Sequence, residues 1–286
     1  MTTPFISFAQ NGEDVILNRA LADVETGRYV DVGANHPLID SVTRSFYDRG
    51  WAGVAIEPNP SFASMYRSER PRDTVIEAAV TDTPDATATF HVIDGTGLST
   101  LVDSISAEHV KGGYGVSDLT VPTIRLDAAI EQSGIGGSDV HFLVVDAEGA
   151  EERVLRSLDF MKYRPWILVI EATSPGTTTA SHSSWEPLVL AAGYEFCLFD
   201  GLSRYYVSKE RSAQLKAALS YPACVFDNFI TQREQRARTE LDAARTDIAM
   251  LSQRVAELQD LVAAVKRTLS WRVTAPLRWV RGIGRH

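Results

Sequence analysis

Three acidic side chains in this sequence stand at the ends of short apolar runs, where they could bind a ligand or take part in proton transfer. Asp31 and Glu57 belong to two such runs near the N-terminus, and Asp146 ends a third. In an open α/β sheet, ligands bind beyond the carboxyl ends of the parallel strands. Carboxylates gathered at that edge can attract a cation, accept hydrogen bonds from hydroxyl groups, or remove a hydroxyl proton.

The first two acids lie in a strand–helix–strand pattern. Residues 29–35 read Tyr-Val-Asp-Val-Gly-Ala-Asn, an apolar run that ends at a glycine-containing turn, which predicts a buried strand. Residues 40–50 follow as a predicted helix, opened by Asp40 or Ser41 and closed by a glycine. Residues 53–57 then predict a second strand that ends in an acid. This unit is typical of a Rossmann-like nucleotide site.

The turn after the first strand indicates which ligand to expect. A dinucleotide site would have G-x-G-x-x-G, whereas here Asp31 is followed by Gly33 and Asn35. A carboxylate would repel a pyrophosphate and attract an ammonium or sulfonium group. S-adenosylmethionine has a cationic sulfur, an amino-acid end, a ribose and no phosphate, so the charge favours it over NAD. We assign these three residues to its amino-acid end and Glu57 to its ribose hydroxyls, with the glycine allowing close approach of the ligand. An ordinary strand with a solvated aspartate is the alternative.

The rest of the first 228 residues continues the alternation of strands and helices. The further predicted strands lie at 74–80, 86–93, 120–126, 141–146, 166–171, 194–199 and 204–207. The last two flank an Asp-Gly pair, which is a strong hairpin signal. Residues 95–115 suit a substrate loop because they are rich in Gly, Ser and Thr, and Asp127 is expected to cap a short helix. The pattern predicts an α/β fold that closes with an antiparallel pair.

Composition excludes several classes of protein. The chain has 286 residues, a hydrophobic fraction of 44% and a net charge of −9, which permits one large domain with an appendage and argues against nucleic-acid binding. Cys197 and Cys224 are too few for a disulfide framework or a cysteine zinc site. The N-terminus has no signal-peptide pattern and no run is long enough to span a membrane, so we expect a cytoplasmic protein, soluble or peripheral.

The C-terminal part carries a heptad repeat. Apolar residues stand seven apart, with a second series three residues after the first four: Leu241, Ile248, Val255, Val262 and Leu269, then Ala244, Leu251, Leu258 and Val265. The repeat predicts a coiled coil, and its Ile, Val and Leu positions favour two parallel strands. We therefore expect a homo-oligomer formed through residues 241–269. A single long helix folded back on the body is the alternative.

A basic segment with two tryptophans follows the repeat. Residues 266–286 contain six Lys or Arg and no acid, and Pro276 is expected to prevent one continuous helix. Tryptophans among basic residues indicate a peripheral membrane contact through residues 270–285, and a frayed tail or a partner-docking segment is the alternative. The predicted divisions of the chain are 1–228, 229–270 and 271–286.

Several motifs together resemble the FkbM family of S-adenosylmethionine-dependent methyltransferases over about residues 5–209. They lie at 10–14 (QNGED), 29–34 (YVDVGA), 41–47 (SVTRSFY), 50–53 (GWAG), 57–58 (EP), 99–101 (STL), 146–151 (DAEGAE), 164–165 (RP) and 200–201 (DG). The resemblance implies a Rossmann-like class I methyltransferase with a seven-stranded, mostly parallel sheet. It also implies O-methylation of a hydroxyl, usually on a sugar or a polyketide-type metabolite. Ala147 departs from the family, which often has valine there.

The resemblance extends the expectations for ligand and acceptor. The family motif suggests that Gln10 caps the pocket. The stretch from Ala79 to Asp82 is expected to border the adenine, and Ser41 to bind the cofactor carboxylate at a helix start. Because the tail resembles segments of bacterial cell-surface polysaccharide enzymes, the expected acceptor is a sugar hydroxyl of a surface glycan, glycolipid or related metabolite.

Methyl transfer to oxygen requires that a hydroxyl give its proton to a base or contact a metal. His36 lies just past the cofactor turn and is a candidate base, with a surface-loop histidine as the alternative. Asp146 and Glu148 flank the reacting region and, with Glu171, could hold Mg²⁺ through oxygen ligands. Their alternatives are cofactor positioning for Asp146 and a helix N-terminal charge for Glu148. Zinc is not expected, because ligand-spaced histidines are absent.

Two other functions stay open from the sequence. A non-catalytic scaffold would use the coiled coil to assemble a complex and the Rossmann-like domain only to dock, although such a domain would not need acids at its strand ends. An NAD-dependent sugar-modifying enzyme would share the fold, but the chain lacks the glycine fingerprint.

Overall fold

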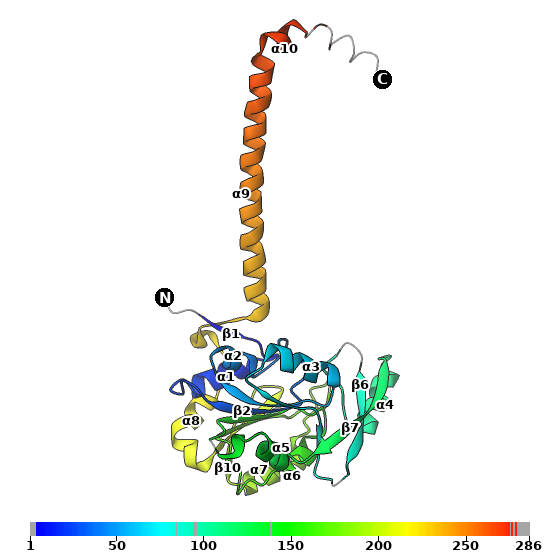
Figure 1. The fold of residues 1–286 in the computed structure, drawn as a ribbon. Helices are drawn as coiled ribbons and strands as arrows, with labels where there is room; N and C mark the ends of the chain where they lie inside the picture. The colour runs from blue at the N-terminus through cyan, green and yellow to red at the C-terminus, as the bar shows by residue number, and fades with distance from the viewer. Residues whose placement is uncertain are drawn as a thin grey trace. The chain divides into compact units, whose positions relative to one another are not determined.

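The computed structural model describes residues 4–83, 85–93, 96–137, 139–274, 276 and 278. The chain divides between Thr231 and Gln232 into two units, which are described separately below (Figure 1). The division falls slightly after the predicted boundary at residue 228. The reason is that β12 (Phe229–Thr231) pairs in parallel with β1 (Phe5–Ser7) and so belongs to the first unit.

A sheet of seven strands, counted over the described residues, forms the centre of the first unit in the order β10-β11-β9-β8-β2-β3-β4. Five neighbouring strands are parallel: β4 (Thr74–Ile76), β3 (Ala52–Ile56), β2 (Arg28–Val32), β8 (Phe142–Val145) and β9 (Ile167–Glu171). The strand β11 (Ser203–Ser208) runs antiparallel to both β9 and β10 (Tyr194–Phe199). The predicted mixed α/β class is confirmed, and the closing hairpin lies where the Asp-Gly pair indicated it.

Helices cover both faces of this sheet, as Figure 1 shows for α1 and α2 on one side and α5, α6 and α7 on the other. Their bounds are Glu13–Ala20, Arg44–Asp48, Leu126–Gln132, Glu151–Arg156 and Glu186–Ala191, respectively. Side chains alternate between the faces of a strand. On β8, Phe142 and Val144 pack into one apolar cluster, and Leu143 and Val145 pack into the other. Because both faces are buried, only the strand ends remain free to contact a ligand.

A smaller sheet of β5 (Ala79–Val80), β7 (Val116–Ile124) and β6 (Thr87–Ile93) follows β4 in the chain. The prediction of one strand over 74–80 was wrong. β4 is the last strand of the large sheet, and after it the chain turns so that β5 pairs with β7 instead. The segment therefore leaves the large sheet after Ile76.

Two further predictions were wrong in this region. The expected loop at 95–115 contains the helix α4 (Asp103–Lys111), which the surrounding Gly, Ser and Thr residues obscured in the sequence. Asp127 does not cap the helix that follows β7. α5 begins at Leu126 with Arg125 at the N-cap, and Asp127 lies in the first turn, where it pairs with the Arg125 guanidinium at 2.7 Å.

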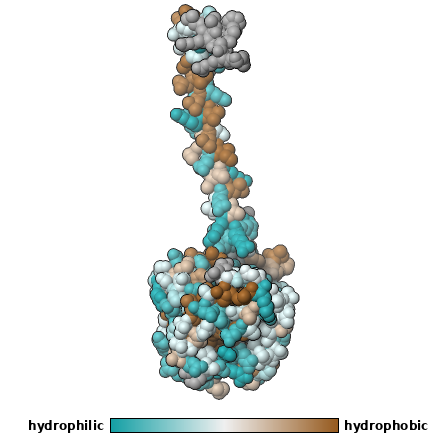
Figure 2. All heavy atoms as spheres, turned by 90° about the vertical axis from the view of Figure 1, so that its right-hand side faces the viewer, coloured by the Kyte–Doolittle hydropathy of each residue, from teal (hydrophilic) through white to brown (hydrophobic). Residues whose placement is uncertain are grey.

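The second unit contains one helix of 36 residues, α9 (Gln232–Arg267), in which no residue is buried. Apolar side chains run along it, drawn in brown in Figure 2. All heptad members in this helix are exposed, and the large ones are Leu241, Ile248, Leu251, Val255, Leu258, Val262 and Val265. The helix itself is confirmed, and its pairing with a second helix stays a prediction.

The helix ends earlier than Pro276 requires. α9 stops at Arg267, and a short helix, α10 (Leu269–Val273), begins after Thr268, whose hydroxyl accepts a hydrogen bond from the Trp271 N–H at 3.3 Å. Most of the predicted membrane-contact segment lies outside the described residues, and that contact stays a prediction. Within the described part of the chain, none of the helices combines the length and the apolar character needed to cross a bilayer.

Candidate active site

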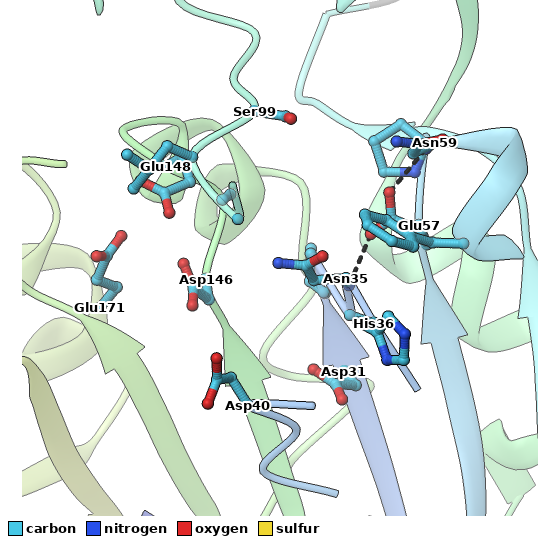
Figure 3. A pocket seen from close by; sticks show the side chains of 18 of the residues that line it. Asp31, Asn35, His36, Asp40, Glu57, Asn59, Ser99, Asp146, Glu148 and Glu171 are labelled. Atoms are coloured by element: carbon cyan, nitrogen blue, oxygen red, sulfur yellow. Dashed lines mark hydrogen bonds between the residues drawn. The ribbon is translucent and has the colours of Figure 1, made fainter. Parts of the chain in front are cut away.

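A cavity of about 1030 Å³ opens at the carboxyl ends of β2, β3, β8 and β9 (Figure 3). This volume suffices for a nucleoside-sized ligand together with a small acceptor. Six carboxylates line it: Asp31, Asp40, Glu57, Asp146, Glu148 and Glu171. Among the described residues, the lining includes neither Lys nor Arg. Such a cavity disfavours a pyrophosphate and favours a cationic ligand.

Glu57 follows β3, and two backbone N–H groups hold its carboxylate. Oε1 accepts a hydrogen bond from the Asn59 N–H at 2.7 Å, and Oε2 accepts one from the Asn35 N–H at 2.7 Å, drawn as dashed lines in Figure 3. Burial raises the pKa of Glu57 to about 7, although these two hydrogen bonds act in the opposite direction. A carboxylate oxygen has two lone pairs, so each oxygen can accept one more hydrogen bond from a ligand hydroxyl.

Asp31 lies within β2, and a buried chain of hydrogen bonds supports it. The Thr43 hydroxyl donates to Asp31 Oδ2 at 2.7 Å, and Arg70 Nη1 donates to that hydroxyl at 2.8 Å. Burial raises the pKa of Asp31 to about 6, while the Thr43 hydrogen bond and the Arg70 charge lower it. Arg70 is fully buried, so its charge partly compensates that of Asp31. Sequence reasoning gave Arg70 no role, because it lies far along the chain from the strand it supports.

Ser41 does not stand at a helix start. α2 begins at Arg44, because Asp40 has a left-handed backbone with φ of 51° and the chain continues through turns to Thr43. The Ser41 side chain lines the cavity, but its hydroxyl accepts a hydrogen bond from Arg70 Nη2 at 2.8 Å. The predicted opening of the helix at Asp40 or Ser41 was therefore wrong, and with it the ground for a carboxylate site there.

Gly33 is required for a reason that the sequence did not indicate. Its φ is 76°, and a Cβ added to it would lie 1.7 Å from the backbone oxygen of Asp146. The close approach thus joins the end of β2 to the end of β8, while Gly33 also lines the cavity, so the predicted approach of a ligand to its backbone stays a prediction. Gly33 thereby fixes the distance between the Glu57 side of the cavity and the Asp146 side.

Three carboxylates meet where β8 and β9 end. Asp146 follows β8, Glu148 lies in the next turn with φ of 47°, and Glu171 ends β9. One oxygen of each lies within 4.8 Å of the other two. Burial, and then the charges of the neighbouring carboxylates, raise the pKa values of Glu148 and Glu171. Oε2 of both side chains is buried and has no hydrogen-bond partner among the described residues.

The turn that presents Glu148 is held from two sides. Glu151 Oε1 accepts hydrogen bonds from the N–H groups of Ala147 at 3.1 Å and Gly149 at 3.0 Å. The Thr100 hydroxyl donates to the backbone oxygen of Glu148 at 2.7 Å. The position of Glu148 is therefore set by the protein before any ligand binds.

His36 lies on the other side of the cavity. In Figure 3 it stands beside Glu57 and apart from Asp146, Glu148 and Glu171. Its Nδ1 accepts a hydrogen bond from the Leu38 N–H at 3.0 Å, so the proton of the neutral ring is on Nε2. Burial lowers the pKa of His36. With Nδ1 engaged and Nε2 protonated, the geometry gives no support to the predicted base role.

Of the remaining predicted residues, most line the cavity and one does not. Gln10, Asn35 and Ala79 line the cavity, whereas Asp82 does not. The second half of the stretch expected to border the adenine, Thr81 and Asp82, therefore lies outside the cavity lining. After β5 the Thr81 N–H bonds to the Ile124 oxygen at 3.0 Å, and this contact directs the chain away from the cavity.

Sequence reasoning also missed two lining residues on the Glu57 side, Asn59 and Phe62. Asn59 caps α3 (Pro60–Glu69), because its side chain accepts a hydrogen bond from the Ser61 N–H at 3.0 Å. An Asn directly before Pro is a helix-start signal, and it could have located this helix against the pocket. Phe62 packs edge-on against His36, with 5.8 Å between the ring centroids.

Comparison with protein families gives one match for this chain. The profile described as the methyltransferase FkbM domain matches residues 31–196, which include β2, β3, β8 and β9. No curated protein matches the chain.

Solved structures resemble the chain at low identity. The FkbM methyltransferase of Methylobacillus flagellatus is 15% identical with a TM-score of 0.36, over 64% of this chain and 44% of that one. This chain thus spans less than half the length of that protein. A TehB-like SAM-dependent methyltransferase of Corynebacterium glutamicum is 11% identical with a TM-score of 0.37, over 70% of this chain and 89% of that one.

Proposed function

The chain belongs to the FkbM methyltransferase family, and on that premise we propose that it transfers the methyl group of S-adenosylmethionine to a hydroxyl oxygen. One observation carries the proposal. The cavity at the strand ends is lined by six carboxylates and, over the described residues, by no basic side chain except His36. S-adenosylmethionine combines a sulfonium, an ammonium and a ribose without a phosphate, so its charges suit this lining better than those of a dinucleotide.

The ligand is placed by matching its parts to the lining. Glu57 accepts hydrogen bonds from the ribose hydroxyls, for which each of its oxygens has a lone pair available. Ala79 and Phe62 border the adenine, and Asp31 with the turn at 33–35 holds the amino-acid end. The methyl group then faces the side of the cavity on which Asp146, Glu148 and Glu171 meet.

The reaction is an in-line displacement. The O–CH₃ bond forms as the S–CH₃ bond breaks, the sulfur keeps the electron pair, and S-adenosylhomocysteine leaves. The hydroxyl proton passes to one of the three carboxylates at the ends of β8 and β9. Asp146 is the carboxylate of the three that suits this role, because burial raises its pKa to about 6, which makes it a stronger base than a solvated aspartate and still leaves it ionised at neutral pH.

For the acceptor we propose a sugar hydroxyl of a bacterial surface glycan, glycolipid or related metabolite. The resemblance of the motifs and the tail supports this class. Hydroxyl-bearing side chains that suit a sugar also line the cavity: Ser99, Thr173, Thr177 and Thr178. Mass spectrometry of surface glycans from cells with and without the protein would identify the methylated sugar.

Calorimetric titration with S-adenosylhomocysteine tests cofactor binding. Glu57→Ala removes an ionised acceptor of two hydrogen bonds, each worth about 1.5–3 kcal/mol, and should weaken binding roughly 100-fold or more without unfolding the protein. Asp82→Asn, whose carboxylate lies off the cavity, should bind like the wild type. No heat and no thermal shift at millimolar ligand would contradict the proposal and favour the non-catalytic scaffold. Quenching of NADH fluorescence would favour the dinucleotide enzyme.

For α9 we propose a second copy of this chain as partner. The exposed apolar residues repeat every seven positions, so the helix is complementary to itself. In a parallel pair with Leu241 at an interior position, Glu240 of one helix faces Arg245 of the other, with opposite charges. No pair of like charges meets at the equivalent flanking positions of the following heptads, which combine Asp247 with Ser252 and Arg254 with Gln259.

A further inference from the structure

We propose that Asp146, Glu148 and Glu171 bind one divalent cation with a preference for oxygen ligands, such as Mg²⁺ or Mn²⁺, on the acceptor side of the cavity. One oxygen of each side chain lies within 4.8 Å of the other two. Figure 3 shows the three carboxylates directed toward a common space. The role of this cation in methyl transfer rests on the proposed function, whereas its binding does not.

A second observation points to an occupant. Glu171 is only 7% exposed, and its Oε2, like that of Glu148, has no hydrogen-bond partner in the described part of the chain. A buried carboxylate oxygen without a partner is costly, and native proteins seldom leave one. The space between these oxygens therefore calls for a positive group.

The protein itself supplies no such group. Asp31 has the Arg70 charge close by, through the Thr43 hydroxyl. The largest charge effects on Glu148 and Glu171 come from other carboxylates, and no Lys or Arg among the described residues lines the cavity. The ammonium of S-adenosylmethionine is placed at the Asp31 end, so the cofactor brings only the single charge of its sulfonium toward the three carboxylates.

The ligand set selects the class of ion. Three carboxylates without His or Cys suit Mg²⁺, Mn²⁺ or Ca²⁺, whereas zinc sites usually include nitrogen or sulfur. Asp146 is exposed to the cavity, so the ion keeps coordination positions that face the acceptor. Two adjacent hydroxyls of a sugar can fill two of them. We therefore expect acceptors with a vicinal diol, whose hydroxyl becomes more acidic on contact with the cation.

The test measures metal binding directly, on the full chain and without cofactor. Mn²⁺ is titrated at pH 8 and followed by the loss of the free-ion signal in electron paramagnetic resonance, with Mg²⁺ as competitor. We expect one Mn²⁺ site per chain that Mg²⁺ displaces. Glu171→Gln and Glu148→Gln should each weaken it at least tenfold, whereas Asp82→Asn should leave it unchanged.

Parallel titration of each sample with S-adenosylhomocysteine separates the possible failures and shows that the variants are folded. Cofactor binding without Mn²⁺ binding would overturn the cation site and leave the proposed function intact. Mn²⁺ binding without cofactor binding would support the cation site and contradict the proposed function. Mn²⁺ binding that neither glutamine variant weakens would place the ion elsewhere and overturn the assignment to these residues.

Discussion

The two units of the chain differ in how their side chains are placed: the first buries polar groups with hydrogen-bond partners, and the second exposes apolar groups. In the first unit, Asp31, Glu57 and Arg70 are buried and hydrogen-bonded at fixed distances. In α9, apolar residues such as Ile248 and Leu258 are exposed, and none is buried. Buried polar groups depend on exact partners, whereas an apolar stripe needs only a partner of the same period. Function in the first unit should therefore be sensitive to small displacements, and assembly through the second only to its pattern.

The largest effect is expected at Gly33. Gly33→Ala places a Cβ against the Asp146 backbone oxygen and also forces a positive φ on a non-glycine residue. We expect a loss of about 3 kcal/mol or more of unfolding free energy, measured by urea denaturation. Gly134→Ala is the matched control, because its φ is 74° but nothing lies within 4 Å of the added Cβ, so about 1 kcal/mol is expected. Equal losses of unfolding free energy in the two variants would contradict the close contact between Gly33 and the Asp146 backbone.

Next in size is the effect of charge in the α9 stripe. Leu251→Asp with Leu258→Asp should convert a dimer into a monomer, because carboxylates cannot be buried in a coiled-coil seam without a partner. Light scattering after gel filtration measures the mass, and cofactor binding should change less than twofold.

Met250→Asp is the matched control for this prediction. Met250 is also apolar and exposed, but it lies one position before Leu251 and outside the seam. It should remain dimeric. A monomeric wild type, or dissociation by Met250→Asp alone, would show that the helix does not pair through the predicted face.

A smaller effect is expected from pH. The pKa of Glu57 is raised to about 7 by burial in the ligand-free protein, and ribose hydroxyls donate to its ionised form. Binding must therefore release a proton at low pH, so affinity is full above pH 7 and falls as pH drops below it. Between pH 8 and pH 6, we expect about tenfold weaker binding of S-adenosylhomocysteine by calorimetry. Glu57→Gln should bind weakly, with little dependence on pH. Tighter binding of S-adenosylhomocysteine at pH 6 than at pH 8 by the wild type would refute the assignment of Glu57 to the ribose hydroxyls.

The smallest effect on cofactor affinity is expected at Asp82, where the prediction from the sequence and the structure differ. Asp82 was expected to border the adenine, but it lies off the cavity lining, whereas Ala79 lies on it. Asp82→Asn should change cofactor affinity less than twofold. Ala79→Leu should weaken it, because Ala79 packs with Phe90, which also lines the cavity, and the added volume would displace that part of the lining. A strong effect of Asp82→Asn would favour the sequence expectation over the structure.

Local patterns explain which elements could be predicted. The runs at 141–146 and 166–171 match β8 and β9 closely, because strands buried on both faces leave an unbroken apolar stretch. The heptad located α9 because its period is a property of the helix alone. α4 was missed because its few apolar residues give little period, and β5 was merged with β4 because strand pairing is not encoded in a single strand.

By itself, the sequence determined the α/β alternation, the long C-terminal helix and the acids that follow the strands, because each produces a recognisable pattern among neighbouring residues. Only the tertiary structure decided that Gly33 serves a contact with Asp146, that Arg70 supports Asp31 through Thr43, and that Asp146, Glu148 and Glu171 converge. These relations join residues that are distant in the chain. Their distances depend on how β2, β8, β9 and α3 pack together, and no local spacing contains that information.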